Sequence, residues 1–333
     1  MSPDARAVPA ARTGKTNVAP VTVIRFAELA PNWGLVPLNM KEGCHRASFR
    51  YIGGPPGANP PAPLPGWDFA NGVVMAPPGN GEPLHDHHCE ECFMVWDGRF
   101  EVFWEDAKTR ARRSVVLGKY DVIRFPAGVM RGFRNAGQAD GYIYFIHGDG
   151  EYRPPVFHES LREDLPPGAR LDPYVRAPAY DPATQVVRYE DCPMNWNVYH
   201  EAKLPQGKRG IRRYVGAVGG EREDEGPPPS LADGEVSFVI NENRAGSGAP
   251  LHDHPDLEEM FIPVEGRFAV QWLDARGEFH QAVLEPWDAC WVPPGVQRGF
   301  RNAGREWGKL HVVQGQPGAP PPEYHQDYSA LRK

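Results

Sequence analysis

Short hydrophobic runs separated by glycine, proline and aspartate dominate this chain. In its first half they are rich in β-branched and aromatic residues: NGVVMA (71–76), CFMVW (92–96), RFEVFW (99–104), SVVL (114–117), DVIRF (121–125) and GYIYFI (141–146). Runs of this length and composition are typical of β-strands. No segment keeps an apolar period of 3.6 residues, so the pattern predicts an all-β fold, either a sandwich or a barrel.

The chain contains two copies of one unit. The segment GNGEPLHDHHCEECFMVWDG at 79–98 returns as GSGAPLHDHPDLEEMFIPVEG at 246–266, and FPAGVMRGFRNAG at 125–137 returns as VPPGVQRGFRNAG at 292–304. A third match links FRYIGG at 49–54 with RRYVGAVGG at 212–220. A repeat of this length predicts two tandem domains.

We place the first domain at 21–150 and the second at 186–316. A connector rich in proline and charge, 151–185, joins them, and tails at 1–20 and 317–333 flank them. Proline- and glycine-rich stretches at 53–66 and 219–234 occupy matching places and predict long loops, which are either lids over a barrel mouth or plain surface excursions.

Composition and charge narrow the class of protein. A chain of 333 residues with 41% hydrophobic and 24% charged residues is ordinary for two globular domains. A net charge of −7 argues against a nucleic-acid or anionic-membrane partner. Five cysteines, placed differently in the two halves, fit a reducing compartment, and the first 20 residues lack the apolar centre of a secretory signal. We expect a cytoplasmic protein.

Each repeat offers a cluster of metal-ligand side chains. His85, His87 and Glu91 have the same parity, so on a strand all three would project from one face. Two imidazoles and one carboxylate form the facial ligand set of Fe(II), Mn(II) and related divalent metals, with positions left open for substrate, water or dioxygen. The sequence therefore predicts a metal site in the first repeat.

The second repeat offers His252 and His254 with either of two glutamates. Glu258 preserves strand parity, whereas Glu259 preserves the distance to the closing glycine, Gly266. Because Pro255 interrupts the strand after the histidines, parity need not persist, and we choose Glu259.

Other polar residues near these clusters have plainer interpretations. Cys89 and Cys92 lack the second cysteine pair of a zinc knuckle, so we expect two packed thiols. The parity of His88 points it away from the ligands. His147, whose counterpart is Gln314, is either a wall residue or a substitute third imidazole. The aromatic residues are expected to fill the barrels: Phe93, Trp96, Phe100, Trp104, Phe133 and Phe300.

The spacing of these motifs resembles the cupin superfamily. Gly79, His85, His87, Glu91 and Gly98 match its first motif, as do Gly246, His252, His254, Glu259 and Gly266. Its second motif is matched by Pro126, Gly128, Arg131 and Asn135, and by Pro293, Gly295, Arg298 and Asn302. The resemblance implies a bicupin, two antiparallel jelly-roll β-barrels in one chain. Bicupins include dioxygenases, decarboxylases and non-catalytic proteins, so the fold does not settle the reaction.

The chain departs from the cupin pattern at one position in each repeat. Arg131 and Arg298 stand where the family has a histidine ligand, and arginine has no lone pair to bind a metal. In one interpretation the metal keeps two histidines and one glutamate, and the arginine anchors a substrate carboxylate. In the other, the arginine pairs with Glu91 or Glu259 and replaces the metal charge.

These alternatives define the functional hypotheses. The first is a non-haem Fe(II) dioxygenase that acts on a small carboxylate-bearing, aromatic substrate. A redox-neutral isomerase, decarboxylase or lyase would use the same metal, with Mn(II), Ni(II) or Zn(II) as other candidates. A metal-free binding protein is the hypothesis from another class. For each we expect a small anionic ligand and a homo-oligomer.

Overall fold

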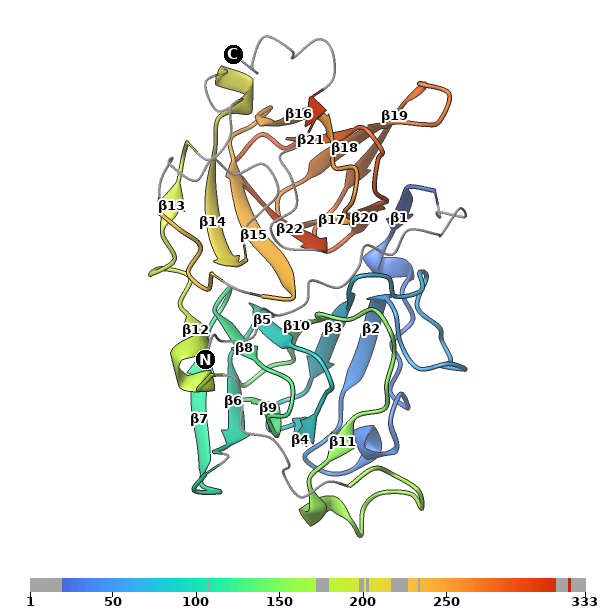
Figure 1. Cartoon of the computed structure of the whole chain (residues 1–333), viewed down its shortest axis with the longest axis vertical. Coiled ribbons are helices and arrows are strands. Elements are labelled where there is room, and N and C mark those ends of the chain that lie inside the picture. Colours follow the sequence, from blue (N-terminus) through green and yellow to red (C-terminus); the bar gives the residue numbers. More distant parts are fainter. Residues whose placement is uncertain are drawn as a thin grey trace, which may run out of the picture.

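The computed structural model describes residues 20–106, 108–171, 180–197, 201, 204–216, 227–232, 234–315 and 323–324. Over these residues the chain is all-β and forms two antiparallel jelly-roll barrels, as the sequence predicted (Figure 1). Of the predicted tails only Pro20, Glu323 and Tyr324 belong to the described residues, and most of the loop 219–234 lies outside them. No helix in the described part of the chain is long and apolar enough to span a bilayer.

The first barrel consists of two facing sheets. The sheet nearer the second barrel has six strands, in the order β12 (Val186–Val187), β8 (Val122–Phe125), β5 (Glu91–Asp97), β10 (Gly141–His147), β3 (Ala70–Ala76) and β2 (Ala47–Ile52). The other sheet has the order β11 (Val156–Phe157), β4 (Gly81–Asp86), β9 (Arg131–Asn135), β6 (Phe100–Glu105) and β7 (Arg112–Leu117).

The second barrel repeats this plan. Its larger sheet has the order β1 (Thr22–Ile24), β20 (Ala289–Val292), β17 (Glu259–Glu265), β22 (Gly308–Gly315), β15 (Val236–Asn243), β14 (Arg209–Val215) and β13 (Met194–Asn195). Its smaller sheet has the order β19 (Phe279–Leu284), β18 (Phe268–Leu273), β21 (Arg298–Asn302), β16 (Gly248–Asp253) and β23 (Glu323–Tyr324).

Helical structure in the described residues is confined to single 3₁₀ turns in the connecting segments. Two of them, η3 and η4, lie in the connector between the barrels, where the proline-rich sequence offers no longer helical pattern. The described turns are η1 (Phe26–Glu28), η2 (Pro37–Met40), η3 (Glu159–Leu161), η4 (Pro182–Gln185) and η6 (Pro205–Gly207).

The two barrels exchange the first strand of each repeat. β1 belongs to the first repeat but pairs with β20 of the second barrel, and β12 opens the second repeat but pairs with β8 of the first barrel. In Figure 1 the blue strand β1 accordingly lies beside the orange and red strands of the second barrel. The repeat boundaries at 21 and 186 therefore separate copies in sequence, whereas in space each copy contributes a strand to the other barrel.

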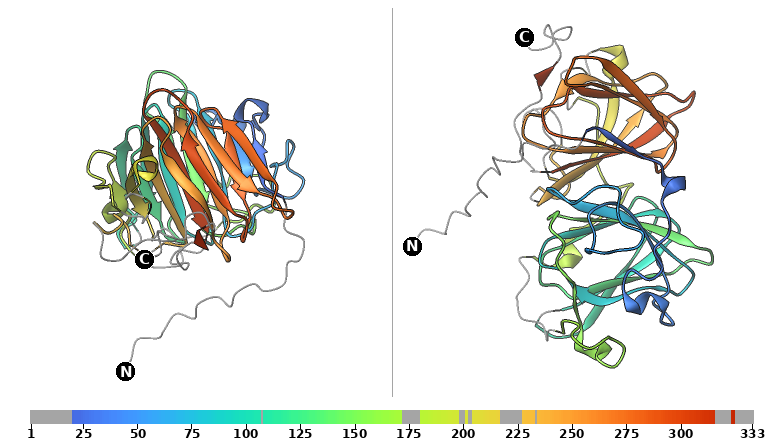
Figure 2. Two further views of the ribbon diagram at one scale, coloured as in Figure 1. Left: turned by 90° about the horizontal axis from the view of Figure 1, so that it is seen from above. Right: turned by 90° about the vertical axis from the view of Figure 1, so that its right-hand side faces the viewer.

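Three hydrophobic clusters stabilise the molecule, one inside each barrel and one between them. Phe93, Phe100, Trp104 and Phe133 fill the first barrel, and Phe300 lies inside the second. Trp96 instead belongs to the third cluster, which draws residues from the facing sheets of both barrels. Figure 2 shows the two barrels one above the other, joined across these sheets. Because they share this buried core, the barrels form one packed body.

Reciprocal hydrogen bonds also link the barrels. The Glu258 carboxylate of the second barrel accepts a hydrogen bond of 2.7 Å from the backbone N–H of Asp68 in the first barrel. The Glu90 carboxylate of the first barrel accepts one of 3.2 Å from the backbone N–H of Glu235 in the second. Asp68 and Glu235 occupy equivalent places before β3 and β15, so the two contacts obey a pseudo-twofold symmetry.

The core between the barrels contains a histidine without a hydrogen-bond partner. His311 on β22 is fully buried, neither ring nitrogen has a partner, and the ring lies 4.8 Å from that of Tyr144 between centroids. Burial lowers the pKa of His311 from 6.5 to about 3. The imidazole is therefore neutral in the folded protein throughout the ordinary pH range.

We predict that His311→Leu reduces the acid sensitivity of the fold. Below pH 6.5 the unfolded chain binds a proton at this position and the folded chain does not, so stability is lost as the pH falls from 6.5 towards 3. Between about pH 7 and pH 5 the free energy of unfolding should fall by about 2 kcal/mol less in the variant than in the wild type. Urea denaturation of the metal-free proteins at both pH values measures this difference, and equal losses would contradict it.

Candidate metal centre

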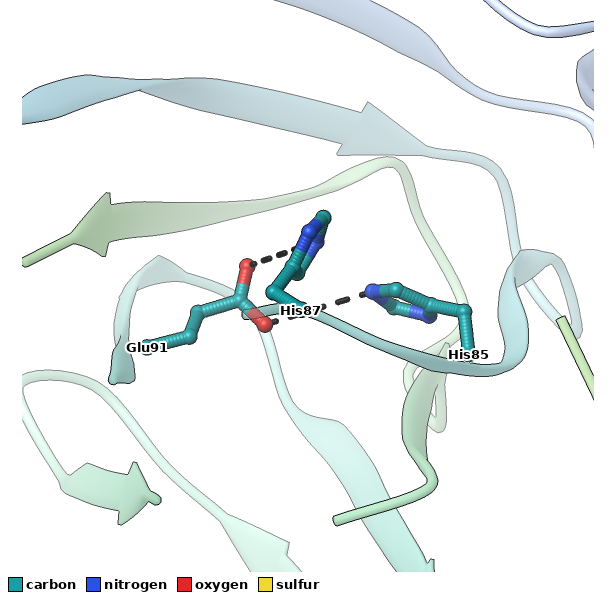
Figure 3. Close-up of side chains that lie close together, drawn as sticks. All are labelled: His85, His87 and Glu91. Carbon is teal, nitrogen blue, oxygen red and sulfur yellow. Dashed lines mark ion pairs between the residues drawn. The ribbon is translucent and has the colours of Figure 1, made fainter. Parts of the chain in front are cut away.

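The first candidate centre lies where β4 leads into β5. His85 is on β4, His87 follows its end, and Glu91 begins β5, so a short turn brings the three side chains together (Figure 3). His85 Nε2 lies 4.0 Å from Glu91 Oε2, and His87 Nε2 lies 3.9 Å from Glu91 Oε1. All three candidate ligand atoms lie within 4.8 Å of one another. Gaps of this size between donors are suited to a bridging ion.

The second barrel gathers the equivalent residues. One ligand atom each from His252, His254 and Glu259 lies within 4.8 Å of the others. Of the two glutamates that the sequence left open, Glu259 faces the histidines. Glu258 faces the first barrel and also accepts a hydrogen bond from the indole N–H of Trp291.

The leading histidine of each centre has its tautomer fixed by the backbone. His85 Nδ1 lies 2.9 Å from the carbonyl oxygen of Pro83, and His252 Nδ1 lies 2.8 Å from that of Pro250. Because a carbonyl can only accept, Nδ1 carries the proton and Nε2 keeps its lone pair. Metal-ligating histidines characteristically donate their second ring N–H to such an acceptor. His85 Nε2 is moreover buried without a hydrogen-bond partner, so a metal ion would satisfy it.

Glu91 is held by one N–H donor on each oxygen. Arg131 Nε donates to Oε2 at 2.8 Å, and His147 Nε2 lies 2.8 Å from Oε1. Burial raises the pKa of Glu91, but Arg131 and His147 outweigh that effect and lower it to about 2. The carboxylate is therefore ionised at neutral pH, and each oxygen retains a lone pair for a metal.

Glu259 has the same support in the second barrel. Arg298 Nε donates to Oε2 at 2.9 Å, and the amide Nε2 of Gln314 donates to Oε1 at 2.8 Å. His147 and Gln314 are thus equivalent donors on β10 and β22. The first centre differs because its donor is a third imidazole, whose centroid is 4.3 Å from that of His87.

The histidines beside these carboxylates favour the neutral form. Burial, with His147 and Arg131, lowers the pKa of His87 well below its usual value. Burial lowers the pKa of His252 as well, and burial with Arg298 lowers that of His254 further. Neutral imidazoles and an ionised carboxylate are the protonation states that metal binding requires. The donor set therefore fits a divalent metal ion such as Fe(II) or Mn(II).

Both arginines of the second motif lie behind the carboxylates. Arg131 is fully buried, and its Nη1 donates to Asp86 and to the carbonyl oxygen of Val129, each at 3.1 Å. Arg298 is equally buried, and its Nη1 donates to the carbonyl oxygen of Val296 at 2.9 Å. Neither arginine lines the pocket of its barrel. Their contacts are those of residues that position the glutamates, and substrate anchoring by them stays a prediction.

The pockets in front of the two centres differ in size. The pocket of the first barrel, including its open mouth, measures about 780 Å³, and His87, Glu91 and His147 lie on its wall. The pocket of the second barrel measures about 350 Å³. Tyr324 on β23 lines this smaller pocket and donates a hydrogen bond to the buried Glu201. The first centre thus faces the larger of these two pockets.

The pocket wall includes polar residues that the sequence did not single out as ligands. His88, expected to point away from the centre, lines the first pocket with its Nε2 3.1 Å from Asp149. Arg50 on β2 also lines it. Cys89 and Cys92 are buried free thiols, as expected. The sequence signal for Arg50 was its place in the repeated FRYIGG segment, but nothing in the segment showed that this side chain reaches the pocket.

A third cluster of possible ligands lies on the surface of the second barrel. Asp274, Glu278 and His280 meet at the hairpin between β18 and β19, where His280 Nε2 lies 3.1 Å from Asp274. All three side chains are at least partly exposed to solvent at this hairpin. Exposed acidic turns of this kind are common without a metal, so His280 serves below as a control.

Known proteins show the same fold. Residues 72–147 match the family described as the cupin domain. The oxalate decarboxylase of Lactobacillus farciminis, solved as a formate complex, is similar over 94% of this chain and 91% of its own, with a TM-score of 0.60 and 14% identity. The oxalate decarboxylase of Bacillus subtilis, solved at pH 4.6, is similar over 92% of this chain and 79% of its own, with a TM-score of 0.59 and 12% identity. No curated protein sequence matches the chain.

The match to the cupin domain lies within the first barrel, and the structural similarity extends over both barrels. Two jelly-roll barrels, each with the histidines and glutamate of the first cupin motif at its centre, complete the correspondence. The first barrel therefore contains a cupin domain, and the chain as a whole has the bicupin fold.

Proposed function

We propose that this bicupin is a metal-dependent enzyme whose first barrel performs a redox-neutral reaction on a small carboxylate, a decarboxylation or a related lyase step. The observation that carries the proposal is the cluster of His85, His87 and Glu91, of which His87 and Glu91 line the larger of the two pockets. The choice of reaction class is supported by the oxalate decarboxylases that share the fold. It replaces the Fe(II) dioxygenase as the leading hypothesis.

One set of residues would bind the metal, and a second set would fix the orientation of its carboxylate ligand. His85, His87 and Glu91 would hold a divalent ion, which as a Lewis acid stabilises negative charge on a carboxylate oxygen. Arg131 and His147 fix the orientation of Glu91 through its two oxygens. Such fixed donors need little rearrangement when the substrate reacts. Decarboxylation replaces the lost CO₂ by a proton, so dioxygen is not required.

A second candidate function is the non-haem Fe(II) dioxygenase. Two histidines and one carboxylate facing an open pocket are also the ligand set of that enzyme class. The Nε2 of His147 is hydrogen-bonded to Glu91, so a metal could bind that nitrogen only by breaking the contact. The intact contact favours a site with two histidines and one carboxylate. The two candidates differ in dioxygen consumption, which can be measured directly.

We predict that the wild type binds up to two equivalents of divalent metal, one for each triad. His87→Ala and His254→Ala should each lose about one equivalent, because a site with two remaining ligands binds a divalent ion weakly. Elemental analysis after purification without chelators or a metal-binding tag measures the content. His280→Ala is the matched control and should equal the wild type. An unchanged metal content in His87→Ala would contradict metal binding by the first triad.

Arg131→His tests whether the arginine supports the metal site or substitutes for it. If Arg131 positions Glu91, the wild type already binds metal in the first barrel, and the variant gains a further ligand without changing the count. Metal that appears in the first barrel only in the variant would instead mean that Arg131 has replaced the metal charge, and the enzymatic proposal would fail.

The reaction class is tested by measuring CO₂ and dissolved oxygen together. Metal-loaded protein is incubated with oxalate and with a series of aliphatic and aromatic carboxylates. We expect CO₂ release without oxygen consumption, and a decrease of at least about 100-fold in His87→Ala. His254→Ala should retain the activity if the first barrel is the reaction centre. Oxygen consumed in proportion to product would favour the dioxygenase, and loss of activity only in His254→Ala would place the reaction in the second barrel.

A further inference from the structure

One arginine on the wall of the first pocket has no counter-charge. Arg50 lies on β2, is partly buried, and lines the same pocket as His87 and Glu91. Its Nε is buried without a hydrogen-bond partner, and among the described residues no carboxylate lies within ion-pair distance of its guanidinium. A buried cation without a partner is costly unless an anion completes the site.

The other arginines on this wall are already paired. Arg46 Nη2 lies 2.8 Å from Glu82, and its Nη1 donates to two backbone carbonyls. Arg153 Nη2 lies 3.0 Å from Glu151 at the exposed rim. Arg50 is therefore the arginine of this pocket whose fork of N–H groups is available to a ligand.

Arg50 is also close enough to act electrostatically on the candidate metal centre. Its charge contributes to lowering the pKa of His87 and of His147, although burial is the largest cause for both. A divalent ion held by the triad would add further positive charge to the same pocket. An anionic ligand placed between the two cations would be attracted by both.

The rest of the wall near Arg50 is largely apolar. Its guanidinium carbon lies 5.0 Å from the centroid of the Phe145 ring. The apolar side chains of the wall include Leu35, Val36, Pro55, Val74, Phe145 and Pro155. A two-carbon dicarboxylate such as oxalate has no apolar surface to bury against them, whereas an aliphatic or aromatic group would gain from the contact.

The second barrel lacks this arrangement, although it has the equivalent arginine. Arg50 pairs in register with Gly72 on β3, and Arg213 pairs with the equivalent Val239 on β15. Arg213 donates to the carbonyl oxygen of Pro227 and does not line the second pocket. Both barrels therefore have an arginine at this position, but only Arg50 of the first barrel lines a pocket beside a candidate metal centre.

We infer that Arg50 binds the carboxylate of the substrate and that the apolar wall around Phe145 holds a non-polar body attached to it. The ligand class is a monocarboxylate with an aliphatic or aromatic group, larger than oxalate. The inference rests on the proposed function for the position of the reaction, but binding can be measured without turnover.

The test is calorimetric titration of the metal-loaded protein with butyrate, benzoate and cinnamate, each compared with its uncharged amide, and with oxalate. A charge-assisted contact predicts that at least one carboxylate binds the wild type about 10- to 100-fold more tightly than its amide. In Arg50→Gln that preference should fall by at least about fivefold, and what remains is the attraction of the metal ion for the anion. Arg50→Lys, which keeps the charge but not the fork, should be intermediate, and Arg213→Gln is the matched control with wild-type preference.

Three results would overturn the assignment: no carboxylate preferred over its amide in the wild type, an undiminished preference in Arg50→Gln, or an equal loss in Arg213→Gln. Metal content and turnover of the same samples separate this inference from the proposed function. Binding that depends on Arg50 without any turnover would overturn only the reaction. Turnover with binding that ignores Arg50 would overturn only the role of Arg50.

Discussion

The buried ion pair between Arg131 and Glu91, repeated as Arg298 and Glu259, is the interaction on which both centres depend. All four side chains are almost completely buried. A carboxylate stays ionised in such surroundings only if its charge is compensated, and removing one partner of a buried pair typically costs about 3–5 kcal/mol. The arginine thus keeps the glutamate charged and aimed at the two histidines. A histidine at this position could bind a metal itself. Arginine cannot, and it serves only to compensate the charge of the glutamate and fix its orientation.

The same scaffold carries two different sites because a few residues around it differ. Each glutamate receives a second hydrogen bond from β10 or β22, but the donor is His147 in one barrel and Gln314 in the other. Tyr324 lines the second pocket, and the equivalent of Arg50 in the second barrel, Arg213, donates a hydrogen bond to the backbone. Residues outside the ligand triads therefore distinguish the two pockets. The duplicated motif alone does not show this difference.

Features encoded in short segments were predictable from the sequence, and contacts between residues far apart in the chain were not. The strands, the two barrels and both triads were predictable, because the apolar runs and the motifs that indicate them lie within short segments of the sequence. The exchange of β1 and β12, the place of Trp96 between the barrels and the partners of Arg50 were not, since they depend on segments far apart in the chain. The choice between Glu258 and Glu259 lay between these cases. The motif spacing favoured Glu259. The role of Glu258 became clear only from the structure, in which it accepts a hydrogen bond from Asp68 of the other barrel.

The glutamate that precedes each triad glutamate, Glu90 or Glu258, connects the two centres physically. Successive residues at the start of a strand point to opposite sides, so Glu91 faces its own barrel while Glu90 reaches the other. The backbone N–H of Glu90 donates to Glu235 at 2.9 Å, and the Glu235 backbone returns a hydrogen bond to Glu90. The strand that begins with Glu91, a candidate metal ligand, is thus held on its other side by hydrogen bonds to the opposite barrel. Because Glu258 likewise accepts a hydrogen bond from Asp68 of the first barrel, each barrel helps to fix the strand that carries the other barrel's triad glutamate.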